Sequence, residues 1–112
     1  MATTQDVEVT LVALMRRVGA LDSATVTLLP PRRTIEARFA DIDAIYHAVW
    51  AQGELGELRR GAATKADIRI TCSSDDLLAM ANGTLTPSRA YATGRVRIDA
   101  SMTDLLRLRS VL

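Results

Sequence analysis

The sequence has few of the residues on which many chemical sites depend. Cys72 is the only cysteine among the 112 residues, and His47 is the only histidine. A single cysteine excludes an internal disulfide and a cysteine-rich zinc site, and a single histidine leaves common metal sites without a second imidazole. We therefore expect no metal or other cofactor, and a reducing, cytoplasmic location is the natural setting.

Aromatic residues, surplus charge and long apolar runs are also scarce. Aromatic residues make up 4% of the chain and the formal net charge is +1. Nucleic-acid-binding domains usually present a basic face and often aromatic rings for base stacking, so nucleic acid is not an expected partner. No apolar run is long enough to span a membrane, and the start of the chain lacks the basic-then-apolar order of a signal peptide. At 48% hydrophobic residues, we expect residues 1–112 to form a single globular domain.

The first half of the chain predicts one helix followed by strands. Apolar residues recur at helical spacing between Thr3 and Gly19. The β-branched run at 23–29 and the alternating run at 33–40 predict two strands. Residues 41–51 fit either a helix or a strand, and we favour a strand because a tight turn, Gln52-Gly53, follows it. We then expect residues 54–61 to be the returning strand of this hairpin.

The second half alternates strands with short helices. Residues 66–72 alternate apolar and polar side chains and predict a strand, as do residues 95–100. Between them, residues 73–83 and 86–94 read as two capped helices that each end at a glycine. Residues 101–112 predict a final, strongly apolar helix. Because both glycines end helices, the glycine-rich stretch 82–94 does not resemble a phosphate-binding loop.

One cluster has the residue types of an acid/base or metal site. Asp41, Asp43 and His47 share one face of the predicted strand, and Tyr46 is adjacent. The alternative is that the two aspartates only form the turn that precedes the strand. A small isomerase-like α+β enzyme therefore stays open as a minority hypothesis. Cys72 follows the apolar alternation of its strand, which favours a buried, inert thiol.

The second half resembles the sterol carrier protein 2 family of lipid-binding domains. The resemblance covers about residues 34–112, and its residues follow the family in order and spacing. They are Ala66-Asp67, Ser74 to Leu77, Gly83, Pro87, Ala90, Gly94-Arg95 and Leu105-Leu106. The resemblance implies an α+β fold with a mixed, mostly antiparallel sheet of about five strands, covered on one face by helices. It also implies an apolar tunnel that takes a fatty acyl chain, acyl-CoA or a sterol without catalysis.

On this reading the ligand lies between the sheet and the C-terminal helices. The candidate contacts are Trp50, Ile68, Ile70, Leu77, Met80, Tyr91, Val96, Ile98, Met102, Leu105 and Leu106. Each of them could equally be ordinary core, and for Tyr91 the sequence does not choose between lipid and core. The alternative function is an interaction module in which the same apolar surface forms a homodimer or docks on a partner enzyme, with no ligand.

Overall fold

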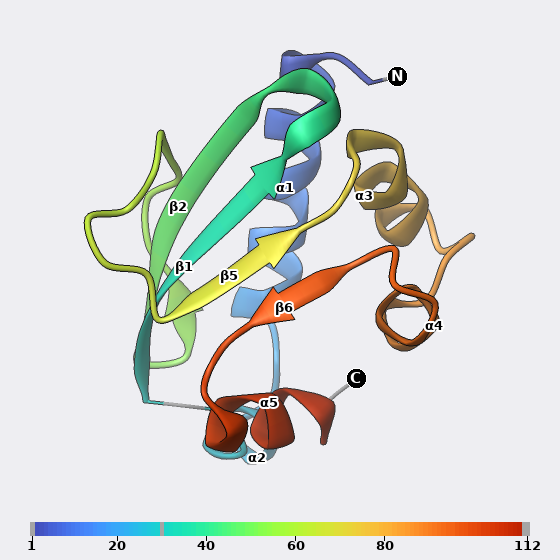
Figure 1. Ribbon diagram of the computed structural model, residues 1–112. Helices are drawn as coiled ribbons and strands as arrows, with labels where there is room; N and C mark the ends of the chain where they lie inside the picture. Colours follow the sequence, from blue (N-terminus) through green and yellow to red (C-terminus); the bar gives the residue numbers. More distant parts are fainter. Residues whose placement is uncertain (1, 30, 111–112) are drawn as a thin grey trace.

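The computed structural model describes residues 2–29 and 31–110, which form one sheet with helices on one side (Figure 1). The elements are α1 (Thr4–Gly19), α2 (Ser23–Thr27), β1 (Arg32–Phe39), a 3-10 turn η1 (Ala40–Ile42), β2 (Ala44–Ala51), β3 (Glu54–Leu55), β4 (Arg59–Arg60), β5 (Ile68–Thr71), α3 (Ser74–Ala81), α4 (Pro87–Ala92), β6 (Arg97–Asp99) and α5 (Met102–Arg109).

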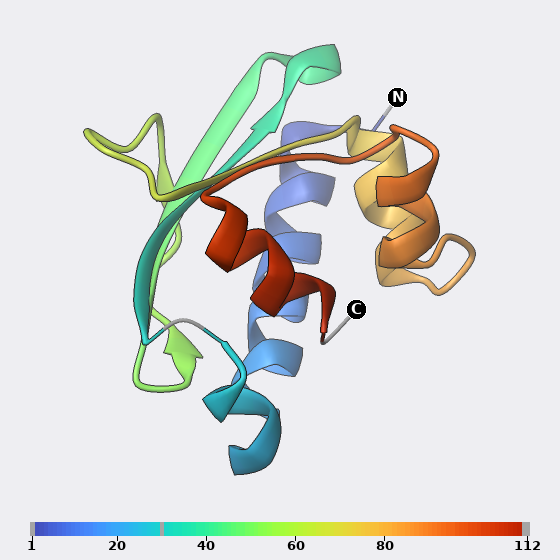
Figure 2. The ribbon, with the colours of Figure 1, turned by 60° about the horizontal axis from the view of Figure 1, so that its bottom comes forward.

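The sheet is mixed, as predicted, and has six strands. Its order is β3-β2-β1-β5-β6, with the short β4 also beside β2. β1 pairs with β5 in parallel, while its pairing with β2 and the pairing of β5 with β6 are antiparallel. The α+β fold class is therefore confirmed. Figure 2 shows the helices gathered on one side of the sheet.

Helix α1 covers part of the sheet, in addition to the C-terminal helices beneath which the ligand was predicted to lie. Its start is fixed by a capping box, in which Thr3 accepts from the Asp6 amide and Asp6 accepts from the Thr3 amide. Val7 is completely buried. At the other end, Arg17 donates to the carbonyl of Ala81 at 2.9 Å and so ties α1 to α3.

The central core lies where α1, α3 and α4 meet the sheet. Its buried members are Val7, Phe39, Tyr46, Cys72, Leu77, Leu85, Ala90 and Val96. The rings of Phe39 and Tyr46 meet edge-on, with centroids 6.2 Å apart. These residues come from every third of the chain, so the short helices are held by tertiary packing more than by their own length.

Residues 23–29 are not a strand, and that expectation was wrong. Ser23–Thr27 forms helix α2, because the Asp22 carboxylate caps it by accepting from the Thr25 amide at 2.7 Å. The β-branched residues that suggested a strand lie in this single helical stretch, where the cap and the chain direction outweigh a weak propensity.

The hairpin after β1 is confirmed, but its returning strand is broken. Gln52 and Gly53 both have positive φ, 54° and 84°, as a tight two-residue turn requires. Only Glu54–Leu55 and Arg59–Arg60 pair with β2, as β3 and β4. Between them Gly56 still donates to the carbonyl of Val49 at 2.9 Å, but residues 56–58 form no strand, so one predicted strand becomes two short ones.

The face of the sheet away from the helices contains a buried charge, that of Glu36, which lies on the polar side of the alternating strand β1. This side chain is fully buried. Its carboxylate accepts from Arg38 at 2.6 Å and from the Ala63 amide at 3.1 Å, and Arg69 lies 3.3 Å away. Burial opposes the charged form, but these donors and the two guanidinium charges outweigh it and lower the pKa of Glu36. The carboxylate thus fastens the loop after β4 onto β1 and β5.

Replacing Glu36 should therefore destabilise the fold. We expect Glu36→Gln to lower the free energy of unfolding by about 2–3 kcal/mol at pH 7, since it removes the charge that two arginines share. Because the folded-state pKa of Glu36 is lowered, its contribution is present above the unfolded value and is lost as pH falls through the folded value. The difference between wild type and variant should therefore shrink below about pH 4. Urea denaturation across pH measures both effects.

Glu57→Gln is the matched control for this measurement. Glu57 forms a 3.5 Å pair with Arg59, and its side chain is 76% exposed. Such a pair contributes little, so we expect a change within about 0.5 kcal/mol. Equal effects of the two substitutions would show that the Glu36 network does not hold the loop.

Candidate functional site

A hollow of about 330 Å³ lies between α1 and the sheet. We call it the α1 hollow. Its lining residues are Leu11, Leu14, Met15, Val18, Leu21, Leu29, Arg33, Ile35, Ala37, Tyr46, His47, Ala48, Trp50, Leu55, Leu58, Ile68, Ile70 and Leu108. Nearly all of these side chains are apolar. The volume falls at the lower end of the range typical of small-molecule sites.

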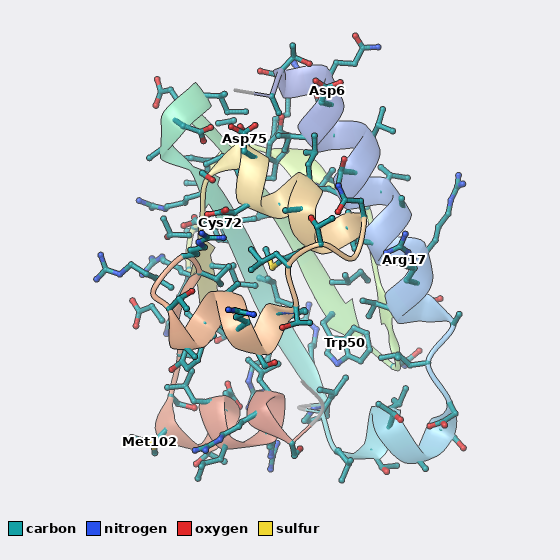
Figure 3. The ribbon with its side chains drawn as sticks, turned by 90° about the vertical axis from the view of Figure 1, so that its right-hand side faces the viewer. Asp6, Arg17, Trp50, Cys72, Asp75 and Met102 are labelled. Carbon is teal, nitrogen blue, oxygen red and sulfur yellow. The ribbon has the colours of Figure 1, made fainter. Side chains whose placement is uncertain are left out.

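Strand alternation explains why the floor of the α1 hollow is apolar. Register pairs Ile35 with both Ala48 and Ile68, so side chains from β2, β1 and β5 lie side by side on one face. Trp50 extends this face and is 5% exposed. Figure 3 shows its ring on the helix side of the sheet, between α1 and α5. The roof comes from the apolar stripe of α1, from Leu21 and Leu29 on either side of α2, and from one α5 residue, Leu108.

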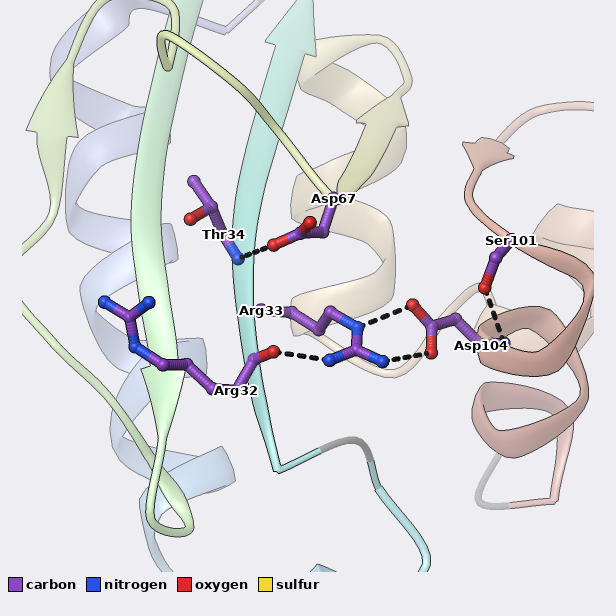
Figure 4. Close-up of polar contacts among 6 residues, drawn as sticks. All are labelled: Arg32, Arg33, Thr34, Asp67, Ser101 and Asp104. Carbon is purple, nitrogen blue, oxygen red and sulfur yellow. Dashed lines mark hydrogen bonds and ion pairs between the residues drawn. The ribbon is translucent and has the colours of Figure 1, made fainter.

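An ion pair stands at the α5 end of the α1 hollow (Figure 4). Arg33, a lining residue, donates to both oxygens of Asp104, at 2.7 and 3.1 Å. Asp104 is 3% exposed, and hydrogen bonding from Arg33 is the main cause that lowers its pKa. Arg33 also donates to the carbonyl of Arg32 at 2.6 Å. The pair fixes α5 to the start of β1.

A second apolar groove, of about 640 Å³, lies between α4 and α5. We call it the α4–α5 groove. Its lining residues are Ser88, Tyr91, Ala92, Ile98, Met102, Leu105, Leu106, Leu108 and Arg109. Leu108 lines both hollows. Two side chains at the rim of this groove face solvent, since Met102 and Leu106 are 71% and 59% exposed.

Comparison with known proteins decides the family. The profile described as "SCP-2 sterol transfer family" matches residues 33–112. The chain belongs to this family. Outside the match lie α1 and α2, although α1 forms the roof of the α1 hollow.

Solved structures with this fold include both small proteins and part of a large enzyme. Sterol carrier protein 2 like 2 from Aedes aegypti has a TM-score of 0.70 at 21% identity, over 96% of this chain and 97% of that one. Its palmitated solution structure has a TM-score of 0.68 at 18% identity, over 98% and 94%. The sec-alkylsulfatase Pisa1 from Pseudomonas sp. has a TM-score of 0.61 at 21% identity, over 88% of this chain but 16% of the enzyme. No curated protein sequence matches the chain.

The predicted contacts of this family member divide among three places. Trp50, Ile68 and Ile70 line the α1 hollow. The α4–α5 groove takes five others, which are Tyr91, Ile98, Met102, Leu105 and Leu106. Leu77 and Val96 are core residues, and Met80 packs against the core. The structure therefore does not bring the predicted set together in one cavity.

Sequence reasoning missed the α1 side of the hollow. Leu11, Leu14 and Val18 are on the predicted helical stripe, and Ile35 and Ala37 are on the predicted strand face. Their periodicity showed that they face the interior, but it did not show which of them pack tightly and which line an empty space. Helix–sheet distance sets that void, and no local pattern records it.

The acid/base cluster has structural partners. Asp41 accepts from the amide and hydroxyl of Ser74, and the hydroxyl contact is the main cause that lowers the pKa of Asp41. Asp43 adopts a left-handed turn conformation with φ of 51°. Nδ1 of His47 lies 2.8 Å from the carbonyl of Gly61. These contacts support the turn interpretation of the two aspartates.

Tyr46 also has a structural position, as a buried residue beside the pair formed by Glu8 and Arg60. It lines the α1 hollow at 2% exposure, and burial raises its pKa, with the nearby charge of Glu8 adding to the effect. Arg60 holds Glu8 through contacts of 2.8 to 2.9 Å. A raised pKa keeps the phenol neutral, which suits an apolar lining.

Within residues 2–29 and 31–110, no cluster of three histidine, cysteine or acidic side chains could hold a metal ion. In the same part of the chain, no helix has the length and hydropathy to cross a membrane.

Cys72 is buried, as predicted, and should be unreactive. Burial is the main cause that raises its pKa to about 12, and the negative charges of Asp76 and Asp41 add to it. At pH 8 the thiolate fraction should then be on the order of a thousandfold below that of an exposed thiol. We expect iodoacetamide to label the native protein slower by at least this order than the urea-unfolded protein. Rapid native labelling, followed by mass spectrometry, would contradict a buried, protonated thiol.

Proposed function

We propose that the protein is a non-catalytic lipid carrier whose α1 hollow shelters a fatty acyl chain. The observation that carries the proposal is an apolar hollow of about 330 Å³ in a member of a sterol transfer family. The name of that family describes transfer and not a chemical conversion. We place the activity in residues 1–112 as one domain; a cytoplasmic location stays a prediction.

An acyl chain suits the hollow better than a sterol. A flexible chain can follow an irregular space between a helix and a sheet, whereas a rigid fused-ring system needs one wide slot. The α1 hollow is small for such a ligand. The palmitated form of a structural neighbour supports the choice, because it shows that one protein of this fold takes an acyl group.

An occupant of the hollow would also relieve an energetic cost. The hollow is partly open, so without an occupant its apolar side chains stay in contact with water, and each Å² of apolar surface that a ligand covers contributes about 25 cal/mol. Water is a poor filler, since the lining offers it few hydrogen-bond partners. A bound chain fills the space without leaving polar groups unsatisfied.

The head group would lie outside the apolar lining. Arg33 is the permanently charged side chain among the lining residues, and its guanidinium already forms an ion pair with Asp104. An acidic head group would have to share Arg33 with Asp104. A bulky one, such as that of acyl-CoA, exceeds the hollow and must extend into solvent.

A ligand-free interaction module is the second candidate, favoured by the exposure of Met102 and Leu106. It predicts a dimer that dissociates on dilution, and no lipid after organic extraction. The contacts of Asp41 with Ser74 leave the isomerase-like hypothesis without support from geometry.

Fluorescence can test the carrier proposal directly. Trp50 is the only tryptophan, so energy transfer from it to cis-parinaric acid reports binding to the protein, and substitutions in the two apolar spaces locate the ligand. We expect transfer in the wild type and a loss of affinity of at least about tenfold in Ala48→Phe, whose ring fills the hollow. Thermal stability of this variant should be kept or raised, because the ring occupies a void.

Ala92→Phe is the matched control, since Ala92 lines the α4–α5 groove instead. It should leave affinity within about twofold of the wild type. Loss of binding in Ala92→Phe but not in Ala48→Phe would move the ligand beneath the C-terminal helices. No energy transfer, together with no lipid in organic extracts, would overturn the carrier proposal.

A further inference from the structure

The α4–α5 groove is rimmed by large apolar side chains that face solvent. Tyr91 on α4 is 45% exposed, and Met102 and Leu106 on α5 are 71% and 59% exposed. Met102 and Leu106 are four residues apart and therefore share one face of α5. Figure 3 shows Met102 at the outer edge of the molecule. Exposed apolar side chains grouped in this way mark an interaction surface.

The charges on the same two helices have one sign at the surface. Arg89, Arg107 and Arg109 are all exposed, and Arg109 lines the groove. The one acidic residue of α4 and α5 is Asp104, which is 3% exposed and paired with Arg33. The nearby Asp99 lines a separate hollow with Arg38 and Arg69. A partner at this surface therefore meets apolar side chains flanked by positive charge.

We propose that the α4–α5 surface docks the protein on an anionic lipid bilayer. A bilayer with acidic head groups matches both features, because apolar side chains enter the boundary of the acyl region while arginines meet phosphate and carboxylate groups. A second copy of the chain fits less well, since a symmetric contact through this face would oppose arginine to arginine.

The position of Leu108 links the proposed docking surface to the proposed lipid site. This side chain lines both the α4–α5 groove and the α1 hollow, so the two spaces meet at α5. A bilayer seated on the groove would lie one side chain from the proposed lipid site. This step rests on the proposed function, whereas the docking itself needs no ligand in the hollow.

Vesicle cosedimentation tests the proposal with the full chain. Sucrose-loaded vesicles of phosphatidylcholine with 30% phosphatidylserine, chosen as roughly the anionic share that attracts basic segments, should bind the wild type, and pure phosphatidylcholine should bind it far less. We expect Arg107→Gln/Arg109→Gln to weaken partitioning about 25-fold, at about fivefold per arginine. Met102→Ser/Leu106→Ser should weaken it about tenfold or more. All four side chains are exposed, so folding should be kept.

Matched controls remove similar groups elsewhere. Val9→Ser changes a 65% exposed apolar residue on α1, and Arg59→Gln changes an arginine whose side chain is 68% exposed. Each should alter partitioning less than twofold. The α4–α5 variants should still bind cis-parinaric acid in vesicle-free buffer, which separates failure of docking from failure of the carrier proposal.

Three results would overturn the docking surface. The first is no binding of the wild type to anionic vesicles, and the second is equal loss in Val9→Ser and Met102→Ser/Leu106→Ser. The third is a dimer in sedimentation that only the α4–α5 variants disrupt, which would assign the surface to a second copy.

Discussion

The apolar face shared by β1, β2 and β5 is the constraint on which the rest of the structure depends. Alternation along these strands sends Ile35, Tyr46 and Ile68 to one side, where they must be covered. Near Val7 the cover is complete, because α1, α3 and α4 converge there on the sheet. Towards Trp50 the roof comes from α1, from Leu21 and Leu29 on either side of α2, and from one residue of α5, and the α1 hollow lies there. The core and the α1 hollow thus share one apolar face of the sheet, which is fully packed near Val7 and incompletely packed near Trp50.

The opposite face shows why the sheet can hold a hollow on one side without losing its shape. Glu36 gathers Arg38, Arg69 and the Ala63 amide, which come from two adjacent strands and the loop after β4. A buried carboxylate with well-placed donors fixes geometry even where its net energy is modest. Polar contacts on the outer face therefore help to align β1 and β5, so their alignment does not depend on apolar packing on the inner face alone.

The sequence predicted local features well because their causes are local. Thr86 and Pro87 start α4, and Gln52-Gly53 forms the turn between β2 and β3, since caps and turns depend on a few adjacent residues. It failed where a single contact outweighed a propensity, as with Asp22 at the start of α2. Nor does any local pattern predict the burial of Glu36, because that burial depends on a loop 27 residues away in sequence. Alternation predicts which face of the sheet a side chain lies on, but it does not predict whether that face is exposed to solvent or covered by a loop.

The sequence predicted an apolar site between the sheet and helices, but it did not predict that α1 would cover that site. Family resemblance and apolar alternation pointed to lipid between sheet and helices, yet the resemblance begins near β1, whereas α1 supplies the roof. The terminal helix α5 connects the two parts, because Leu108 faces both hollows while Arg33 and Asp104 hold the helix in position. A helix of eight residues is too short to be stable alone, so this ion pair and a few leucines set its position. Because Arg33 and Leu108 both line the α1 hollow, the ion pair that positions α5 also fixes one end of that hollow.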